Sequence, residues 1–187
     1  MQNPRLATRY AKSLIDLAVE QNSMEQTLKD VQLLDATMKG SRELTSVLRS
    51  PVIKADKKDA VITAIFGSQL SVLTMAFVKL LTAKGREATL PEITTAFMSQ
   101  YRLMHHISEI TLITATPVSD DVKENIRQKV AAALPGQSIE MKTKVQPELI
   151  GGFILEMGDK LVDASIKRDL ADIRKQFTQN LYVPNIK

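Results

Sequence analysis

The chain has 187 residues, of which 44% are hydrophobic, and its 25 basic and 21 acidic residues give a net charge of +4. This length and composition suffice for one medium-sized or two small globular domains with an ordinary core. The absence of cysteine excludes disulfides, thiolate metal sites and a cysteine nucleophile. No basic run exceeds two residues, which disfavours nucleic-acid binding, because that affinity comes from neutralising several adjacent phosphates.

The first part of the chain has the apolar periodicity of amphipathic helices. A first helix is expected to begin at Asn3 and Pro4, because Asn accepts from early amides and Pro has no amide proton to satisfy. A second helix is expected to begin at Ser23, where the sequence to Gln26 resembles a capping box, and to end at Gly40. Four more helices are predicted at about 44–48, 55–66, 70–83 and 91–104.

Beyond these helices the apolar pattern alternates with the period of strands. Strands are predicted at 109–116, 138–145, 149–157 and 161–162, and helices at 120–134 and after Ser165. Gly158 and Asp159 suit the tight turn of a hairpin. The predicted fold class is α+β, with an N-terminal six-helix bundle in residues 1–105 and a small C-terminal α/β domain in residues 106–187.

Residues 60–78 carry no charge and are close to the length of a membrane span. Gly67, Ser68 and Gln69 interrupt this segment at its centre, so two helices joined by a turn fit better. The N-terminus also lacks the apolar core of a signal peptide. We therefore expect no transmembrane segment and no removable leader.

Residues that could perform chemistry have simpler structural explanations. His105 and His106 are adjacent, so on a helix they diverge by about 100° and cannot chelate a metal as an i, i+4 pair can. Gly151 and Gly152 lack the Lys and further glycines of a phosphate-binding loop. The carboxylates near residue 160 occur where turns and caps already favour Asp. The sequence predicts neither a catalytic, metal or cofactor site nor an enzyme.

The segment 149–170, LIGGFILEMGDKLVDASIKRDL, resembles the C-terminal signature of the delta subunits of F-type ATP synthase. Their mitochondrial counterpart is the oligomycin-sensitivity-conferring protein. The residues that carry this signature are Gly151, Gly152, Gly158, Asp159, Asp163 and Ser165. Residues 7–17 and 80–86 also resemble the first helix and the fifth-to-sixth helix junction of that family, so the likeness covers essentially the whole chain.

The resemblance implies a non-catalytic stator subunit that links the catalytic head to the b subunits and couples proton-driven rotation to ATP synthesis. It implies that the N-terminal helix of an alpha subunit binds between the first and fifth helices, and that the C-terminal domain holds the C-terminal end of b. The implied contact residues are Ala7, Tyr10, Ala11, Leu14, Phe77, Leu80 and Leu81. The alternative for these residues is that they only pack the bundle. The implied location is peripheral, on the cytoplasmic face of the bacterial cell membrane.

Two other functions stay open at this point. The basic isoelectric point, about 9.3, allows a helical nucleic-acid-binding or regulatory protein with an appended α/β module. A small enzyme is a third alternative, with little in the sequence to favour it. Binding to phosphates weakens steeply with added salt, whereas binding in an apolar groove does not, so salt dependence distinguishes the first two functions.

Overall fold

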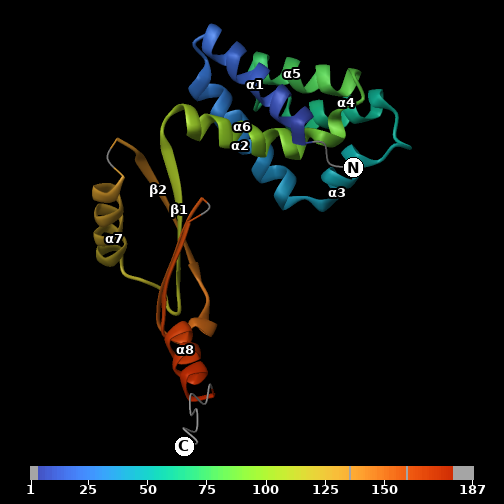
Figure 1. Ribbon diagram of the computed structural model, residues 1–187. Helices are drawn as coiled ribbons and strands as arrows, with labels where there is room; N and C mark the ends of the chain where they lie inside the picture. The colour runs from blue at the N-terminus through green and yellow to red at the C-terminus, as the bar shows by residue number, and fades with distance from the viewer. Residues whose placement is uncertain (1–3, 135, 159, 179–187) are drawn as a thin grey trace, which may run out of the picture. The chain divides into compact units, whose positions relative to one another are not determined.

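The computed structural model describes residues 4–134, 136–158 and 160–178, and the chain divides into two compact units between Met104 and His105. The N-terminal unit is helical (Figure 1). Its elements are α1 (Pro4–Glu20), α2 (Met24–Gly40), α3 (Arg42–Arg49), α4 (Ala55–Phe66), α5 (Val72–Ala83), the 3-10 turn η1 (Glu87–Thr89) and α6 (Leu90–Met104).

The core of the N-terminal unit forms where the apolar faces of its helices pack together, small side chains against large ones. α1 buries Ala7, Ala11 and Ala18 on one face, and α6 buries Phe97 completely. Small side chains let α6 lie close along α1, as the 2.9 Å bond from Nε2 of Gln100 to the Thr8 carbonyl shows. The same core includes Leu14, Val31, Leu34, Leu48, Ile62, Phe66, Val78, Leu81, Leu90 and Ile93.

The structure corrects one predicted helix cap in this unit, whereas the cap predicted at Asn3 lies outside the described residues. α2 begins after Ser23, but the Ser23 hydroxyl caps no amide, so the predicted capping box is wrong. Nε2 of Gln26 instead points forward and donates to Oδ1 of Asp30 at 3.2 Å. The expected turn within residues 60–78 is confirmed, because α4 ends at Phe66 and α5 begins at Val72. Among the described residues, no helix is long and apolar enough to cross a bilayer.

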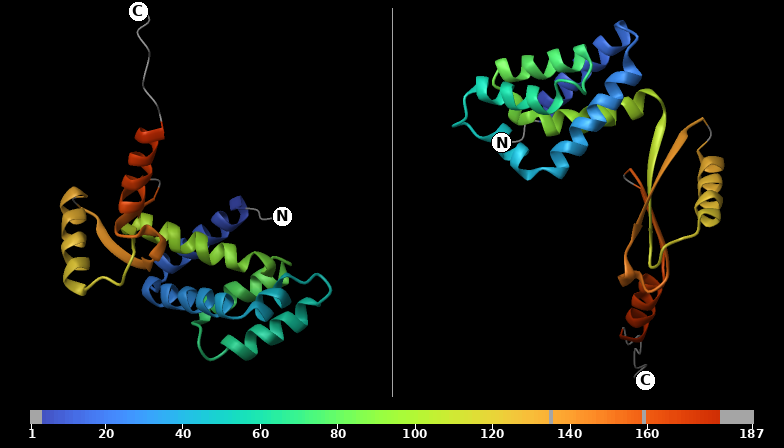
Figure 2. Two further views of the ribbon diagram at one scale, coloured as in Figure 1. Left: turned by 90° about the horizontal axis from the view of Figure 1, so that it is seen from below. Right: turned by 180° about the vertical axis from the view of Figure 1, so that it is seen from behind.

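The C-terminal unit is built on a four-stranded mixed sheet (Figure 2). Its elements are β1 (Ile107–Thr114), α7 (Asp120–Ala133), β2 (Ser138–Val145), the 3-10 turn η2 (Pro147–Leu149), β3 (Gly152–Met157), β4 (Lys160–Ser165) and α8 (Ile166–Thr178). The strand order is β2-β1-β3-β4, with β1 and β2 parallel and the other pairs antiparallel. The parallel pair requires a crossover, which α7 provides.

The predicted strand at 149–157 is shorter in the structure. Leu149 belongs to η2 and is buried, and Ile150 has a positive φ of 67°, so pairing begins only at Gly152. The centre of the sheet is buried at Ile110 and Leu112 of β1. Around this narrow centre most apolar side chains stay partly exposed, and α7 buries no residue fully. The architecture is α+β, as the sequence predicts.

Candidate partner-binding surfaces

An exposed apolar stripe runs along α1 and α5. The rings of Tyr10 and Phe77 meet edge to face, with centroids 6.4 Å apart and planes at 72°. Leu17 is 40% exposed and Leu80 is 49% exposed, so apolar side chains continue from this contact to solvent on both helices. We refer to Tyr10, Leu17, Phe77 and Leu80 as the α1–α5 surface.

The other residues that the resemblance implies for this contact lie beneath the surface. Ala7, Ala11, Leu14 and Leu81 are at most 2% exposed. They hold the helices together, so they set the spacing of the stripe and do not reach a partner directly. Of the implied residues, Tyr10 and Leu80 are the ones with a substantial accessible area.

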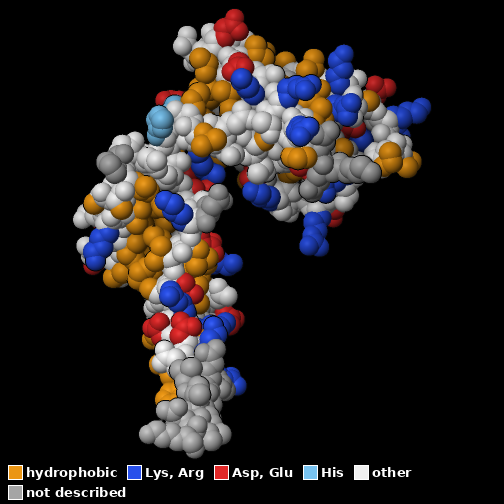
Figure 3. Space-filling view, viewed as in Figure 1, with side chains coloured by type: hydrophobic (Ala, Val, Ile, Leu, Met, Phe, Trp, Pro, Cys, Tyr) orange, Lys and Arg blue, Asp and Glu red, His pale blue; other side chains and the backbone are white. Residues whose placement is uncertain are grey.

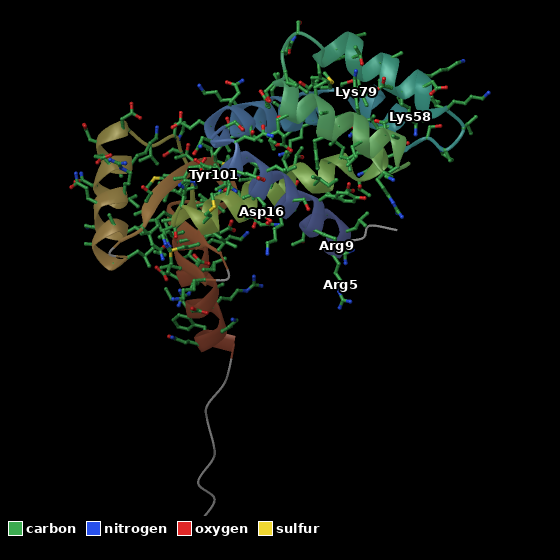
Figure 4. The ribbon with its side chains drawn as sticks, turned by 90° about the horizontal axis from the view of Figure 1, so that it is seen from above. Arg5, Arg9, Asp16, Lys58, Lys79 and Tyr101 are labelled. Carbon is green, nitrogen blue, oxygen red and sulfur yellow. The ribbon has the colours of Figure 1, made fainter. Side chains whose placement is uncertain are left out.

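Charged residues border the stripe on its solvent side. Arg9 and Asp16 project from α1, and Lys79 projects from α5 (Figure 4). Arg9 and Asp16 directly precede Tyr10 and Leu17, so on a helix they lie about 100° from the stripe, toward water. The surface therefore has an apolar centre and a rim of mixed charge, which is the usual organisation of a protein interface.

The structure contains a hollow that the sequence did not indicate, on the other side of α1. This α1–α6 groove has a volume of about 630 Å³ and is lined by Pro4, Ala7, Thr8, Pro91, Glu92, Thr95, Ala96 and Ser99. The Thr8 and Thr95 hydroxyls already donate to the carbonyls of Pro4 and Pro91, at 2.8 and 3.0 Å. The groove wall is thus chiefly apolar. Facing alanines on the two helices were the one signal in the sequence that could have indicated it.

The C-terminal unit exposes several large apolar side chains on β4 and α8. Leu161 and Val162 on β4 are 60% and 56% exposed. On α8, Ile166, Leu170, Ile173 and Phe177 are all at least 45% exposed. Figure 3 shows hydrophobic side chains gathered on the visible face of this unit. Large exposed apolar patches mark interaction sites in soluble proteins.

The signature glycines have geometric explanations in the C-terminal unit. A Cβ at Gly151 would lie 2.6 Å from Cδ1 of Ile166, so this glycine makes room for the start of α8. Gly152 has a φ of 75°, and a Cβ there would lie 2.1 Å from the Ala164 carbonyl oxygen. Gly158 also has a positive φ, as the predicted hairpin turn requires.

Asp163 and Ser165 have structural roles at the junction of β4 and α8. The amide of Ser165 donates to Oδ1 of Asp163 at 2.9 Å, and the Ser165 hydroxyl accepts from the amide of Arg168 at 3.3 Å. Hydrogen bonds from the side chain and amide of Ser165 lower the pKa of Asp163 below its ordinary value. The predicted cap at Ser165 is confirmed, whereas Asp159 lies outside the described residues.

Groups suited to catalysis do not gather in the described part of the chain. No cluster of three or more His, Cys, Asp or Glu with metal-binding geometry occurs there. His105 and His106 lie between α6 and β1, and His106 has a positive φ of 52°. Each unit instead presents an exposed apolar surface that is suited to contact with other proteins.

Comparison with known proteins identifies the family. Residues 6–177 match the family model described as ATP synthase delta (OSCP) subunit. The chain belongs to this family. It is 34% identical over 181 residues to the ATP synthase subunit delta of Cytophaga hutchinsonii, covering 97% of this chain and 98% of that protein. It is 31% identical to the subunit delta of Christiangramia forsetii, with both chains fully covered.

A solved structure has the same fold as the delta-family chain. A chain of the Toxoplasma gondii mitochondrial ATP synthase hexamer superposes with a TM-score of 0.72 at 19% identity, covering 92% of this chain and 97% of that chain. The predicted function is confirmed at the level of the family: the chain is a non-catalytic peripheral-stalk subunit of an F-type ATP synthase. The nucleic-acid-binding alternative is not supported.

Proposed function

We propose that this delta subunit joins the catalytic head to the b subunits, so that the head is held against the torque of the rotor. Proton-driven rotation is then coupled to ATP synthesis, with the subunit held peripherally at the cytoplasmic face of the bacterial cell membrane. The observation that carries the proposal is that each of the two units presents its own exposed apolar surface. A connector needs two such surfaces, one for each part that it holds.

The α1–α5 surface is the proposed seat of the alpha subunit's N-terminal helix. Tyr10 offers a large ring that is only partly buried, and Tyr is among the residues that often dominate binding energy. Leu80 extends the apolar contact on α5. An amphipathic helix that lays its apolar face on such a stripe is a common mode of peptide recognition.

The apolar character of this surface suits a connection under load. Exposed salt bridges contribute little and are screened by salt, whereas burial of apolar area on a preformed surface slows dissociation. The bundle beneath Tyr10 and Leu80 is already packed, so binding requires little ordering. The proposed second contact, between the C-terminal unit and the C-terminal end of b, draws support from the exposed residues of β4 and α8.

The test is calorimetric titration of the full chain with a synthetic peptide of the alpha N-terminal helix from the same organism. We expect Tyr10→Asp and Leu80→Asp each to lower the affinity for the peptide about 30-fold or more, as loss of a central apolar contact does. Circular-dichroism melts should remain close to that of the wild type, because neither side chain is fully buried.

Thr95→Asp is a matched control, because it places the same charge in the α1–α6 groove. This variant should bind the peptide as the wild type does. Loss of affinity in Thr95→Asp with normal binding in Tyr10→Asp would move the contact to the α1–α6 groove. Failure of the wild-type chain to bind either the alpha peptide or the soluble part of b would overturn the proposed function.

A further inference from the structure

One side of α1 carries a row of exposed charges next to the α1–α5 surface. Arg9, Asp16 and Glu20 are spaced by seven and four residues. At about 100° per residue these three side chains lie within about 40° of one another, on the side that borders the apolar stripe. Arg5 lies four residues before Arg9, one turn earlier on the same side. We refer to Arg5, Arg9, Asp16 and Glu20 as the α1 flank.

The charges of the α1 flank are sorted by sign along the helix. Figure 4 shows Arg5 and Arg9 projecting near the start of α1, with Asp16 further along. Glu20 is the last residue of the helix. Lys12 lies further round the helix and keeps the same order, since it precedes both carboxylates. At about 1.5 Å per residue, Arg5 and Glu20 are about 22 Å apart along the axis. The α1–α5 surface therefore has a positive end and a negative end.

This order of charges is the reverse of the order that stabilises a helix. Carboxylates are favourable near the N-terminus and cations near the C-terminus, because they offset the helix macrodipole. α1 has no acidic residue in its first turn and no basic residue in its last turn. By contrast, α2, α3 and α6 each have an acidic residue in the first turn and a basic residue in the last. Local preferences are broken chiefly where function requires it, so the flank charges of α1 point to a partner.

The α1 flank makes no ion pair within the described part of the chain. Its four residues are exposed, and none of their side chains pairs with an opposite charge there. Arg9 and Asp16 are two turns apart on the helix, so they do not reach each other. Elsewhere in the same unit, Nη2 of Arg49 pairs with Oε1 of Glu92 at 2.9 Å. The flank charges of α1 are therefore available to charges on a bound helix.

The apolar stripe by itself does not fix the direction of a bound helix, because burial of apolar area is non-directional. On α5, the residues that border Leu80 along the helix are the uncharged Ala76 and Ala83. Lys79 is two residues from Phe77, whose ring meets α1 near the middle of the stripe. A charge at that position meets a bound helix near its centre in either direction. The direction therefore depends on charges at the two ends of the surface, which the α1 flank supplies.

We propose that the α1 flank fixes the direction in which the alpha subunit's N-terminal helix lies on the α1–α5 surface, an inference that rests on the proposed function. The end of the bound helix that carries carboxylates along its edge lies beside Arg5 and Arg9. The end that carries Lys or Arg lies beside Asp16 and Glu20. The apolar stripe supplies affinity, whereas the flank disfavours the reversed helix, because like charges then face each other.

The first experiment measures the direction of the bound helix. The alpha peptide from the same organism carries a nitroxide label at one end or the other, and amide signals of the full chain are followed by NMR. A label at the carboxylate-bearing end should broaden amides around Arg5 and Arg9, and a label at the other end should broaden amides around Glu20. Lys79→Glu is the matched control for a change of sign, because it alters a rim charge near the middle of the stripe. It should leave both broadening patterns unchanged.

The second experiment exchanges the signs of the flank without changing the net charge. The exchanged chain carries Arg5→Glu, Arg9→Glu, Asp16→Lys and Glu20→Lys. Its melting temperature should rise, because the charges of α1 then offset the macrodipole. It should bind the alpha peptide about tenfold more weakly at low ionic strength, with a smaller effect in added salt. An alpha peptide whose acidic and basic residues are exchanged end for end should bind the exchanged chain with the original affinity, and the wild type about tenfold more weakly.

The outcomes separate this inference from the proposed function. If the alpha peptide does not bind the wild-type chain, the proposed function fails. If the peptide binds the wild type and the exchanged chain equally well, or if each label broadens both ends of α1 alike, the inference is overturned while the proposed function stands. A reversed pattern in Lys79→Glu would also overturn it, because direction would then not depend on the α1 flank. A lower melting temperature of the exchanged chain would assign the flank charges to the stability of α1, with the same consequence.

Discussion

Nζ of Lys58 lies 2.6 Å from Oε1 of Glu87, with both side chains at least nine-tenths buried. The same ammonium donates to the Leu48 carbonyl at 2.9 Å. This contact joins the end of α3, the first turn of α4 and η1. Figure 4 marks Lys58 on α4. A buried pair of this kind is costly to break, because removing one partner leaves the other charge without compensation.

Lys58→Met should therefore lower the free energy of unfolding of the N-terminal unit by about 3–5 kcal/mol. The double variant Lys58→Met with Glu87→Leu should recover most of that loss, to within about 1–2 kcal/mol of the wild type, because no buried charge remains. Urea denaturation followed by circular dichroism measures both. A double variant that is less stable than Lys58→Met alone would contradict this account.

A second buried carboxylate links α2 to the start of α5. Oδ2 of Asp30 accepts from the amide of Ser71 at 2.9 Å and from the Ser71 hydroxyl. Asp30 is 2% exposed, so both bonds are shielded from water. Since Ser71 caps α5, this contact fixes the helix that carries Phe77 and Leu80.

Asp30→Ala should cost about 2–3 kcal/mol of stability, because the Ser71 amide and hydroxyl lose a charged acceptor. It should also weaken binding of the alpha peptide, since α5 is no longer held in place. Denaturation and calorimetric titration of the same variant measure the two effects. Lys39→Ala on the same helix is the control: its side chain is 73% exposed where it pairs with Asp35, so less than about 1 kcal/mol should be lost.

The sequence was sufficient to predict the helices but not the contacts around them. Amphipathic periodicity identified α1 to α6 because each helix buries one face. The capping pattern at Ser23 predicted the correct start of α2 but not its hydrogen bonds, because the Gln26 side chain donates to Asp30 and does not reach back to Ser23. That acceptor is itself positioned by Ser71, 41 residues further along the chain. A local pattern cannot include such a neighbour.

The residues of the candidate surfaces were also predictable from the sequence only in part. The resemblance indicated a contact near α1 and α5, but periodicity alone cannot separate residues that pack a bundle from residues that bind a partner. Leu14 and Tyr10 belong to one face of α1, yet Leu14 is 2% exposed and Tyr10 is only partly covered. The strand order of the sheet could not be predicted from the sequence either, because the parallel pairing of β1 and β2 depends on tertiary packing.

The depressed pKa of Asp163 predicts an acid-dependent stability of the C-terminal unit. A carboxyl whose pKa is lowered by folding stabilises the fold at pH values above its ordinary pKa of 3.8. That contribution is lost as the pH falls from 3.8 through the lower folded value. Asp163→Asn should therefore be less stable than the wild type near neutral pH, and the difference should shrink in acid.

Hydrogen exchange of the β4 and α8 amides at several pH values measures this difference. Ser165→Ala removes the hydroxyl that contributes most to the shift in the pKa of Asp163. The stability of this variant should therefore depend less on pH than the stability of the wild type. If the stability difference between Asp163→Asn and the wild type stays constant from neutral pH to below 3.8, titration of Asp163 does not cause the pH dependence.

Gly152 should be the least replaceable glycine of the signature. A Cβ there would lie 2.1 Å from the Ala164 carbonyl oxygen, and the φ of 75° is unfavourable for other residues. Because the obstructing atom is backbone, the β3–β4 pair must separate to admit the methyl group. Gly152→Ala should destabilise the C-terminal unit by at least about 2–3 kcal/mol.

Gly158→Ala is the matched control, because its φ is also positive but its Cβ would meet no atom within 4 Å. Only backbone strain of about 1 kcal/mol is then expected. Hydrogen exchange resolved by segment separates the two units, so α1 to α6 serve as an internal reference. Equal losses for the two variants would mean that the positive φ, and not the close approach of β4, makes glycine necessary at position 152.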